Sequence, residues 1–227
     1  MLRDLLSEIY WSRFGAPARS LWPKPPQPPS NTAHWDGQVS GFFAPRLGHT
    51  LSVDLRNEMI GELICHKSDK EIRSVLDLGC AGGTLLPVLQ ERGVQSYIGV
   101  DISHAALAEA RRAYPSAEYQ VGTVENFHST KSFDLIVLSE VLYYLDFRYV
   151  VANVRRCSEL LVPGGMLCIS LNLRNPKARA IQRKLESQLQ YIGGFLYQEK
   201  SQIDDRLQRN RECPPYHTFL ARINPAA

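Results

Sequence analysis

The chain has 227 residues, enough for one sizeable α/β domain with an appendage. Its hydrophobic content of 44% and charged content of 22% are those of a soluble globular protein, and its net charge of +3 is too small to indicate a nucleic-acid partner. No apolar run approaches the ~20 residues of a membrane-spanning helix. The acidic residues Asp4 and Glu8 near the start also argue against a signal peptide.

The cysteine pattern indicates a reducing compartment. There are 5 cysteines, an odd number, and no two of them form a Cys-x-x-Cys pair. We therefore expect free thiols, a cytoplasmic protein and no metal site.

The first 66 residues precede the predicted catalytic core. Apolar side chains recur at helical spacing over residues 2–14, which predicts an amphipathic helix, and residues 16–30 contain six prolines, which predict an extended linker. Such a helix could cap an active site, dock on a partner subunit to form a homodimer, or touch a membrane surface. Residues 34–48 are rich in aromatics and predict an ordered loop, and residues 51–64 predict a helix that packs on a sheet.

Residues 75–84 read as a strand, a tight turn and the start of a helix. An apolar run containing Asp77 breaks at Gly79, and helical spacing resumes near Thr84. Gly79, Gly82 and Gly83 are expected to take turn conformations that other residues avoid, so that a ligand can lie against the backbone. The dinucleotide fingerprint Gly-x-Gly-x-x-Gly does not fit, because its second and third glycine positions hold Ala81 and Thr84.

With Asp77, Gly79 and Gly83, and with Ala81 in place of the middle glycine, this stretch resembles motif I of class I S-adenosylmethionine-dependent methyltransferases. The resemblance covers about residues 50–224 and implies a Rossmann-like α/β fold. That fold has a seven-stranded, mostly parallel sheet with an antiparallel last strand and helices on both faces. We therefore expect three regions: 1–30 as helix and linker, 31–66 as a lid segment and first packing helix, and 67–227 as the methyltransferase core.

Two further strands follow in the expected order. Residues 97–101 form a strand that ends in Asp101, where open α/β nucleotide sites hold ribose hydroxyls. Ser103 is expected to cap a helix over residues 104–114. Residues 119–122 predict the third strand. The resemblance then places adenine recognition at Thr123 and Val124, although many relatives have Asp at the first of these positions.

The fourth strand, residues 133–140, is continuously apolar and is expected at the centre of the sheet. A helix over 147–161, a Pro-Gly-Gly turn and a strand over 166–171 follow. Residues 139–145, Ser-Glu-Val-Leu-Tyr-Tyr-Leu, are also similar to the nodulation-type N-methyltransferases. A helix over 176–192, strands over 195–200 and 216–223, and a surface loop over 201–215 complete the expected elements.

The resemblance implies S-adenosyl-L-methionine as cofactor and in-line transfer of its methyl group to an O or N atom of a small molecule, with a sugar or saccharide-containing metabolite as one candidate. Two alternatives stay open: a protein or RNA methyltransferase, and a non-catalytic nucleotide-binding or scaffold protein with the same fold. The cofactor-binding residues expected on this basis are Asp77, Gly79, Cys80, Ala81, Gly83, Asp101, Ile102, Thr123, Val124 and Ser139.

Catalytic candidates come from the ends of the predicted strands. Glu140 follows the fourth strand and is the first choice for a general base, and His217 is a second. Tyr143, with Tyr144 or Trp35, is expected to face the sulfonium or an amine acceptor. Cys213-Pro-Pro-Tyr resembles the tetrapeptide of nucleic-acid amino methyltransferases, but it lies before the last strand rather than after the fourth, so we expect no nucleic-acid substrate.

Overall fold

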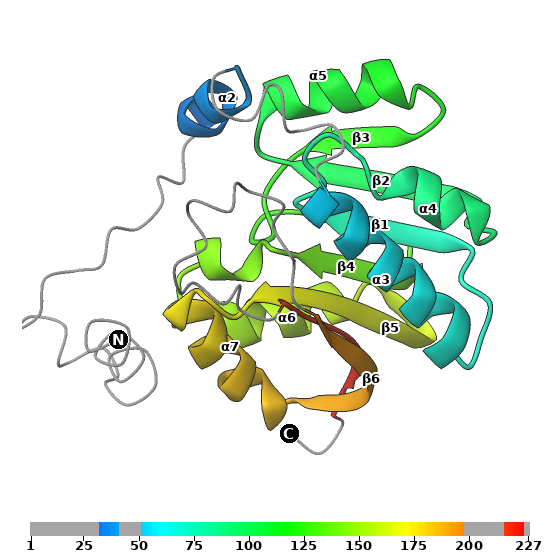
Figure 1. Ribbon diagram of the computed structural model, residues 1–227, viewed down its shortest axis with the longest axis vertical. Helices are drawn as coiled ribbons and strands as arrows, with labels where there is room; N and C mark the ends of the chain where they lie inside the picture. Colours follow the sequence, from blue (N-terminus) through cyan, green and yellow to red (C-terminus); the bar gives the residue numbers. More distant parts are fainter. Residues whose placement is uncertain (1–31, 41–50, 198–215, 225–227) are drawn as a thin grey trace, which may run out of the picture.

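The computed structural model describes residues 32–40, 51–197 and 216–224. The predicted N-terminal helix, the proline-rich segment and the loop 201–215 lie outside the described residues and are drawn in grey (Figure 1). Within the described part, no helix is both long and apolar enough to cross a membrane. The elements are, in order, α2 (Thr32–Ser40), α3 (Leu51–Lys67), β1 (Ser74–Leu78), α4 (Leu86–Glu91), β2 (Ser96–Asp101), α5 (His104–Ala113), β3 (Glu118–Val121), β4 (Phe133–Ser139), the 3₁₀ helix η2 (Leu142–Tyr144), α6 (Val150–Ser158), β5 (Leu161–Asn172), α7 (Pro176–Glu186), β6 (Leu189–Tyr197) and β7 (Tyr216–Ile223).

Seven strands form one sheet in the order β3-β2-β1-β4-β5-β7-β6. β1 lies parallel between β2 and β4, and β7 runs antiparallel to both β5 and β6. The predicted fold class is confirmed. Because the chain leaves β1 first toward β2 and later toward β4, the sheet has its topological switch point at β1, where open α/β folds bind ligands.

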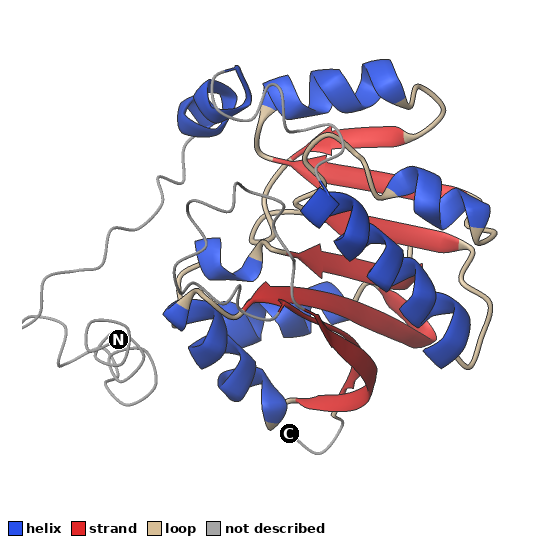
Figure 2. Ribbon diagram, in the orientation of Figure 1, coloured by secondary structure: helices blue, strands red, loops and turns tan. Residues whose placement is uncertain are grey.

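Helices cover both faces of the sheet (Figure 2). One core cluster joins α3, α4 and α5 to one face through residues such as Ile60, Leu86 and Leu107. The other joins α6 and α7 to the opposite face through residues such as Val154 and Ile181. The apolar side chains of β1 alternate between the two clusters, so the strand is buried on both faces as a central parallel strand should be.

Several predicted elements differ from the structure; among them, α6 covers only Val150–Ser158 and β5 begins at Leu161, so that it includes the predicted Pro-Gly-Gly turn. Residues 32–40 form helix α2 where a loop was expected. The helix predicted over 176–192 ends at Glu186, and β6 begins at Leu189 rather than at residue 195. Pairing with β7 satisfies the backbone groups of this stretch, so a long-range contact overrides the local helical pattern. α4 begins at Leu86 instead of near residue 84 and is only 6 residues long.

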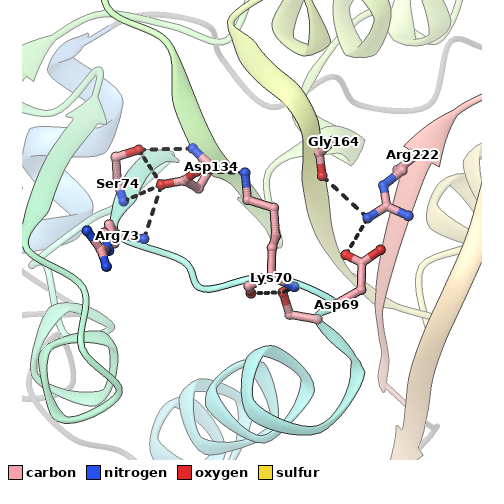
Figure 3. A network of polar contacts seen from close by, with 8 residues as sticks. Asp69, Lys70, Arg73, Ser74, Asp134, Gly164 and Arg222 are labelled. Carbon is pink, nitrogen blue, oxygen red and sulfur yellow. Dashed lines mark hydrogen bonds and ion pairs between the residues drawn. The ribbon is translucent and has the colours of Figure 1, made fainter.

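A polar network ties the N-terminal edge of the sheet together (Figure 3). Asp134, at the start of β4, accepts hydrogen bonds from the N–H groups of Arg73 and Ser74 at 3.1 and 2.9 Å and from the Ser74 hydroxyl at 2.8 Å. Lys70 Nζ lies 2.8 Å from its other oxygen. Partial burial acts to raise the pKa of Asp134, but these bonds outweigh it and lower the pKa to about 2. The α3–β1 connection is thereby fixed to β4.

Candidate functional site

The turn after β1 is built from left-handed residues. Gly79, Ala81 and Gly83 have φ values of 89°, 47° and 73°. Gly82, which the sequence also suggested for a special conformation, is not among them. Ala81 thus adopts at some energetic cost the conformation that a glycine would take freely. The N–H groups of Gly79 and Cys80 donate to the Val100 carbonyl at 2.7 and 3.0 Å, so β2 fixes the turn.

Asp101 at the end of β2 faces this turn. Its Oδ2 accepts from the N–H of Ala81 and its Oδ1 from the N–H of Ser103, both at 2.9 Å. Burial raises the pKa of Asp101, and these backbone hydrogen bonds act to lower it. The Ile102 N–H also hydrogen-bonds to Asp101, and because a carboxylate can accept about four hydrogen bonds, the group keeps capacity for a further donor. The geometry therefore suits recognition of a sugar hydroxyl.

Asp77 is placed deeper than the sequence suggested. It is almost fully buried and accepts a hydrogen bond from Tyr97 Oη at 2.8 Å. Burial raises its pKa to about 7, while the Tyr97 hydrogen bond acts to lower it. Cys80 is also buried, and burial raises the pKa of its thiol well above the usual value. The Cys80 thiol is therefore not a reactive thiolate, and its backbone N–H and carbonyl are bonded to Val100 and Gly83.

Glu140 and Tyr143 are brought together. Glu140 directly follows β4 and has a left-handed φ of 58°. Its Oε2 accepts from Tyr143 Oη at 2.9 Å and its Oε1 from Ser170 Oγ at 3.3 Å. Thr218 Oγ1 donates in turn to Ser170 Oγ at 2.9 Å. Burial raises the pKa of Glu140, so the carboxyl is better suited to take up a proton than an exposed glutamate.

His217 lies elsewhere. Side chains alternate along β7, and His217 shares a face with Phe219, whose ring centroid lies 4.7 Å away and which belongs to the core cluster under α6 and α7. Thr218, the residue between them, points to the Glu140 side. The structure therefore separates His217 from Glu140 by the thickness of the sheet. Burial also lowers the pKa of His217.

Ser139 and the residues after β3 are placed as follows. Ser139 Oγ is buried and has no hydrogen-bond partner among the described residues. Thr123 and Asn126 close a turn by exchanging hydrogen bonds of 2.7 and 3.2 Å. The Val124 side chain is buried in the core, so only its backbone can meet a purine edge. Ile102 follows Asp101 and is half-buried. Their part in cofactor binding stays a prediction.

Aromatic rings gather beside Glu140. The Trp35 and Tyr144 rings meet edge to face with centroids 4.9 Å apart, and Tyr143 and Tyr144 lie 4.7 Å apart. The sequence named these three residues as candidates for one wall, and the structure brings them together from α2 and η2.

Arg56 on α3 was missed. Its Nε is buried and has no hydrogen-bond partner among the described residues. Burial raises the pKa values of Asp77, Glu140 and Tyr143, and the positive charge of Arg56 acts to lower all three. The Arg56 side chain is therefore within electrostatic range of these groups. The available signal was its position: it falls on the helical stripe of Ile60, where a charge is out of place.

Comparison with known proteins identifies the class. The fold matches the N-methyltransferase NodS from Bradyrhizobium japonicum WM9 in complex with S-adenosyl-L-homocysteine, with a TM-score of 0.69 and 19% identity over 86% of this chain and 98% of that one. Residues 75–165 match a family model described as a methyltransferase domain, and the fold is that of the class I S-adenosylmethionine-dependent methyltransferase superfamily.

Within that superfamily, the chain is similar to two curated enzymes. It is 34% identical over 159 residues to a ubiquinone biosynthesis O-methyltransferase of Nitrobacter winogradskyi, covering 65% of this chain and 58% of that protein. It is 34% identical over 131 residues to a trans-aconitate 2-methyltransferase of Acidovorax sp., covering 56% of this chain and 49% of that protein. The chain thus spans about half the length of these relatives.

These findings confirm the predicted resemblance to the superfamily and to the nodulation-type N-methyltransferases and, for the matched methyltransferases, the enzyme class with S-adenosyl-L-methionine as cofactor. The site fits that group. The Asp101 carboxylate would suit a ribose hydroxyl, the left-handed turn would suit a ligand lying close to the backbone, and Arg56 Nε, which has no partner among the described residues, would suit a carboxylate.

Proposed function

We propose that this chain binds S-adenosyl-L-methionine at the C-terminal edge of β1 and β2 and transfers its methyl group to an O or N atom of a small molecule. One observation supports this most strongly. The Asp101 carboxylate is fixed by backbone N–H groups, among them those of Ala81 and Ser103, beside the left-handed turn, and it retains capacity to accept a further hydrogen bond.

The chain's own residues divide the work of binding. Asp101 accepts hydrogen bonds from the ribose hydroxyls. The ligand lies close to the backbone of the turn at Gly79, and this turn requires glycine because a Cβ there would lie 2.9 Å from the Val141 side chain. Arg56 supplies the positive charge that complements a carboxylate. Thr123 and the Val124 backbone face the purine.

Glu140 is the proposed general base. The bound cofactor supplies an activated methyl group, so the protein mainly aligns the acceptor and manages its proton. Glu140 takes that proton from the acceptor hydroxyl or ammonium. The Tyr143 hydroxyl, 2.9 Å from Glu140 Oε2, holds the carboxylate in position. The rings of Trp35 and Tyr144 form a wall beside it.

The acceptor is proposed only by class. One curated relative is named as an O-methyltransferase and the other as a trans-aconitate 2-methyltransferase, and the structural neighbour is named as an N-methyltransferase. A hydroxyl or an amine of a small metabolite, including one that carries a sugar, is therefore the proposed acceptor.

The direct test is binding of S-adenosyl-L-homocysteine by calorimetry, followed by release of that product from S-adenosyl-L-methionine in the presence of phenols, carboxylic acids, sugars, amino sugars, a peptide mixture and RNA. Binding and turnover with a small acceptor are expected. Failure to bind at millimolar concentration would refute the cofactor site, binding without turnover would favour the non-catalytic alternative, and turnover with peptide or RNA alone would refute the acceptor class.

The role of Glu140 is tested by the pH dependence of turnover. If its carboxylate is the base, the rate rises with pH through a pKa above the usual glutamate value. Glu140→Gln should then lose that rising limb and about 10²–10⁴-fold in rate. Tyr143→Phe keeps the carboxylate, so its rising limb should persist. An unchanged profile in Glu140→Gln would exclude Glu140 as the base.

A further inference from the structure

Helix α2 contacts both sides of the proposed site. In Figure 1 it lies beside the N-terminal end of α5, at the edge toward which the parallel strands point. Asp101 follows β2 and Glu140 follows β4, and β1 lies between these strands. Two neighbouring residues of α2, Trp35 and Asp36, reach one side each.

Asp36 reaches the Asp101 side. Its Oδ1 accepts from Ser103 Oγ at 2.7 Å and from the N–H of Ala105 at 3.0 Å. The N–H of Ser103 donates at 2.9 Å to Asp101. Ser103 is therefore held by two carboxylates at once: the proposed ribose acceptor and the side chain from α2. Ser103 thus links the side chain of α2 directly to Asp101.

Trp35 reaches the Glu140 side. Its ring lies 4.9 Å from that of Tyr144, next to Tyr143, whose hydroxyl donates to Glu140. These contacts hold α2 across the end of β1. Asp36 precedes its two partners, Ser103 and Ala105, by 67 and 69 positions in the sequence. The arrangement therefore depends on tertiary contacts alone.

We propose that Asp36 is a positioning residue: its hydrogen bonds to Ser103 and Ala105 hold α2 across the site, fix the turn that bears Asp101 and keep Trp35 against Tyr144. This inference rests on the proposed function, since it assigns α2 to retention of the same cofactor. The consequence is that cofactor affinity depends on a carboxylate that does not itself touch the cofactor.

The experiment compares Asp36→Ala with Asp36→Asn in a background in which Trp11 and Trp22 are replaced by Phe, so that Trp35 is the remaining tryptophan. Affinity for S-adenosyl-L-homocysteine is measured by calorimetry, and acrylamide quenching of Trp35 is measured without and with that ligand. Glu109→Ala is the matched control, because Glu109 is an exposed acidic residue of α5 whose partner is Arg112, within the same helix.

Asp36→Ala should bind the ligand at least about fivefold more weakly, the lower end of usual coupling between sites, and should show stronger quenching of Trp35. Asp36→Asn should recover most of both, because its amide oxygen can accept the same two bonds. α5 should stay folded, since Ser103 Oγ still accepts from the N–H of Ala106 at 3.1 Å. Glu109→Ala should resemble the parent.

Three results would overturn the proposal: parent-like affinity in Asp36→Ala, parent-like quenching in that variant, or an Asp36→Asn variant as weak as Asp36→Ala, which would assign the effect to charge. If the parent itself does not bind the ligand, the proposed function fails. The ligand-free quenching comparison still tests the contact, and equal quenching there would overturn the role given to Asp36 independently.

Discussion

Carboxylates of opposite character lie at the two edges of the central sheet. At the N-terminal edge, Asp134 is surrounded by donors, and its pKa is lowered to about 2 (Figure 3). At the C-terminal edge, burial raises the pKa of Asp77 to about 7 and also raises that of Glu140. The same sheet thus stabilises a charge at one edge and penalises it at the other.

Backbone conformation marks the same division. Among the described residues, the non-glycine residues with left-handed φ, Ala81 and Glu140, lie at the C-terminal edge, together with the buried atoms Arg56 Nε and Ser139 Oγ, which have no partner among those residues. Such backbone strain and unsatisfied groups cost stability and persist where function requires them. The comparison teaches that the N-terminal edge holds the fold together, while the C-terminal edge keeps donors, acceptors and charge available for a ligand.

The largest effect is expected from a comparison of two glycines, one at each edge of the sheet, that have nearly equal φ values. Gly79 and Gly93 have φ values of 89° and 88°, but a Cβ at Gly79 would lie 2.9 Å from Val141, whereas a Cβ at Gly93 would meet nothing within 4 Å. Gly79→Ala should therefore weaken binding of S-adenosyl-L-homocysteine by more than about 100-fold, or about 3 kcal/mol. Calorimetry gives the affinity.

Gly93→Ala is the control. It introduces the same backbone strain, about 1–2 kcal/mol, at the N-terminal edge, so it should lower the free energy of unfolding and leave ligand affinity unchanged. Equal loss of affinity in both variants would show that strain in general, rather than the position at the site, governs binding.

The next effect concerns Asp101. Asp101→Ala removes the proposed ribose acceptor and the partner of the Ala81 N–H, and should weaken S-adenosyl-L-homocysteine binding by about 1–3 kcal/mol, the scale of a charge-assisted hydrogen bond. Asp101→Asn keeps one acceptor oxygen and should lose less. Calorimetric affinity equal to that of the unchanged protein would remove Asp101 from the site.

Local signals predicted much of this edge. The strand, turn and helix around Gly79 and the Ser103 cap follow from spacing and residue type within a few positions. His217 shows the limit of such reasoning. Its strand was predicted, but a shift of one residue decides which face a side chain takes, and the sequence does not specify that register.

Tertiary contacts decided what the sequence could not. Helix α2 forms where a loop was expected, and its Asp36 bonds to residues far along the chain. β6 replaces the end of a predicted helix because it pairs with β7. Arg56 gave a sequence signal, a charge on an apolar stripe, but its nearness to Asp77 and Glu140 depends on how α3 packs on the sheet.

A smaller effect is expected in stability at the C-terminal edge. The pKa of Asp77 is higher in the folded protein than in the unfolded chain. Its contribution to the free energy of unfolding is therefore present below the unfolded pKa near 4 and is lost as pH rises toward about 7. Asp77→Asn keeps an acceptor for Tyr97 Oη and removes the buried charge. It should raise the free energy of unfolding at pH 8 by about 1–3 kcal/mol and little at pH 4. Urea unfolding at both pH values checks this, and equal effects at both would contradict it.

The smallest effect has the opposite sign. The folded pKa of Asp134 is lowered to about 2, so its contribution is present above the unfolded value near 4 and disappears as pH falls through about 2. Asp134→Asn should lower the free energy of unfolding at pH 7 by about 1–2 kcal/mol, allowing for solvent screening, and the loss should shrink below pH 4. Ligand affinity should not change, because Asp134 and its partners Lys70 and Ser74 lie at the edge of the sheet opposite the site. A loss of affinity in this variant would show that the two edges are coupled and that stability and binding are not divided between them.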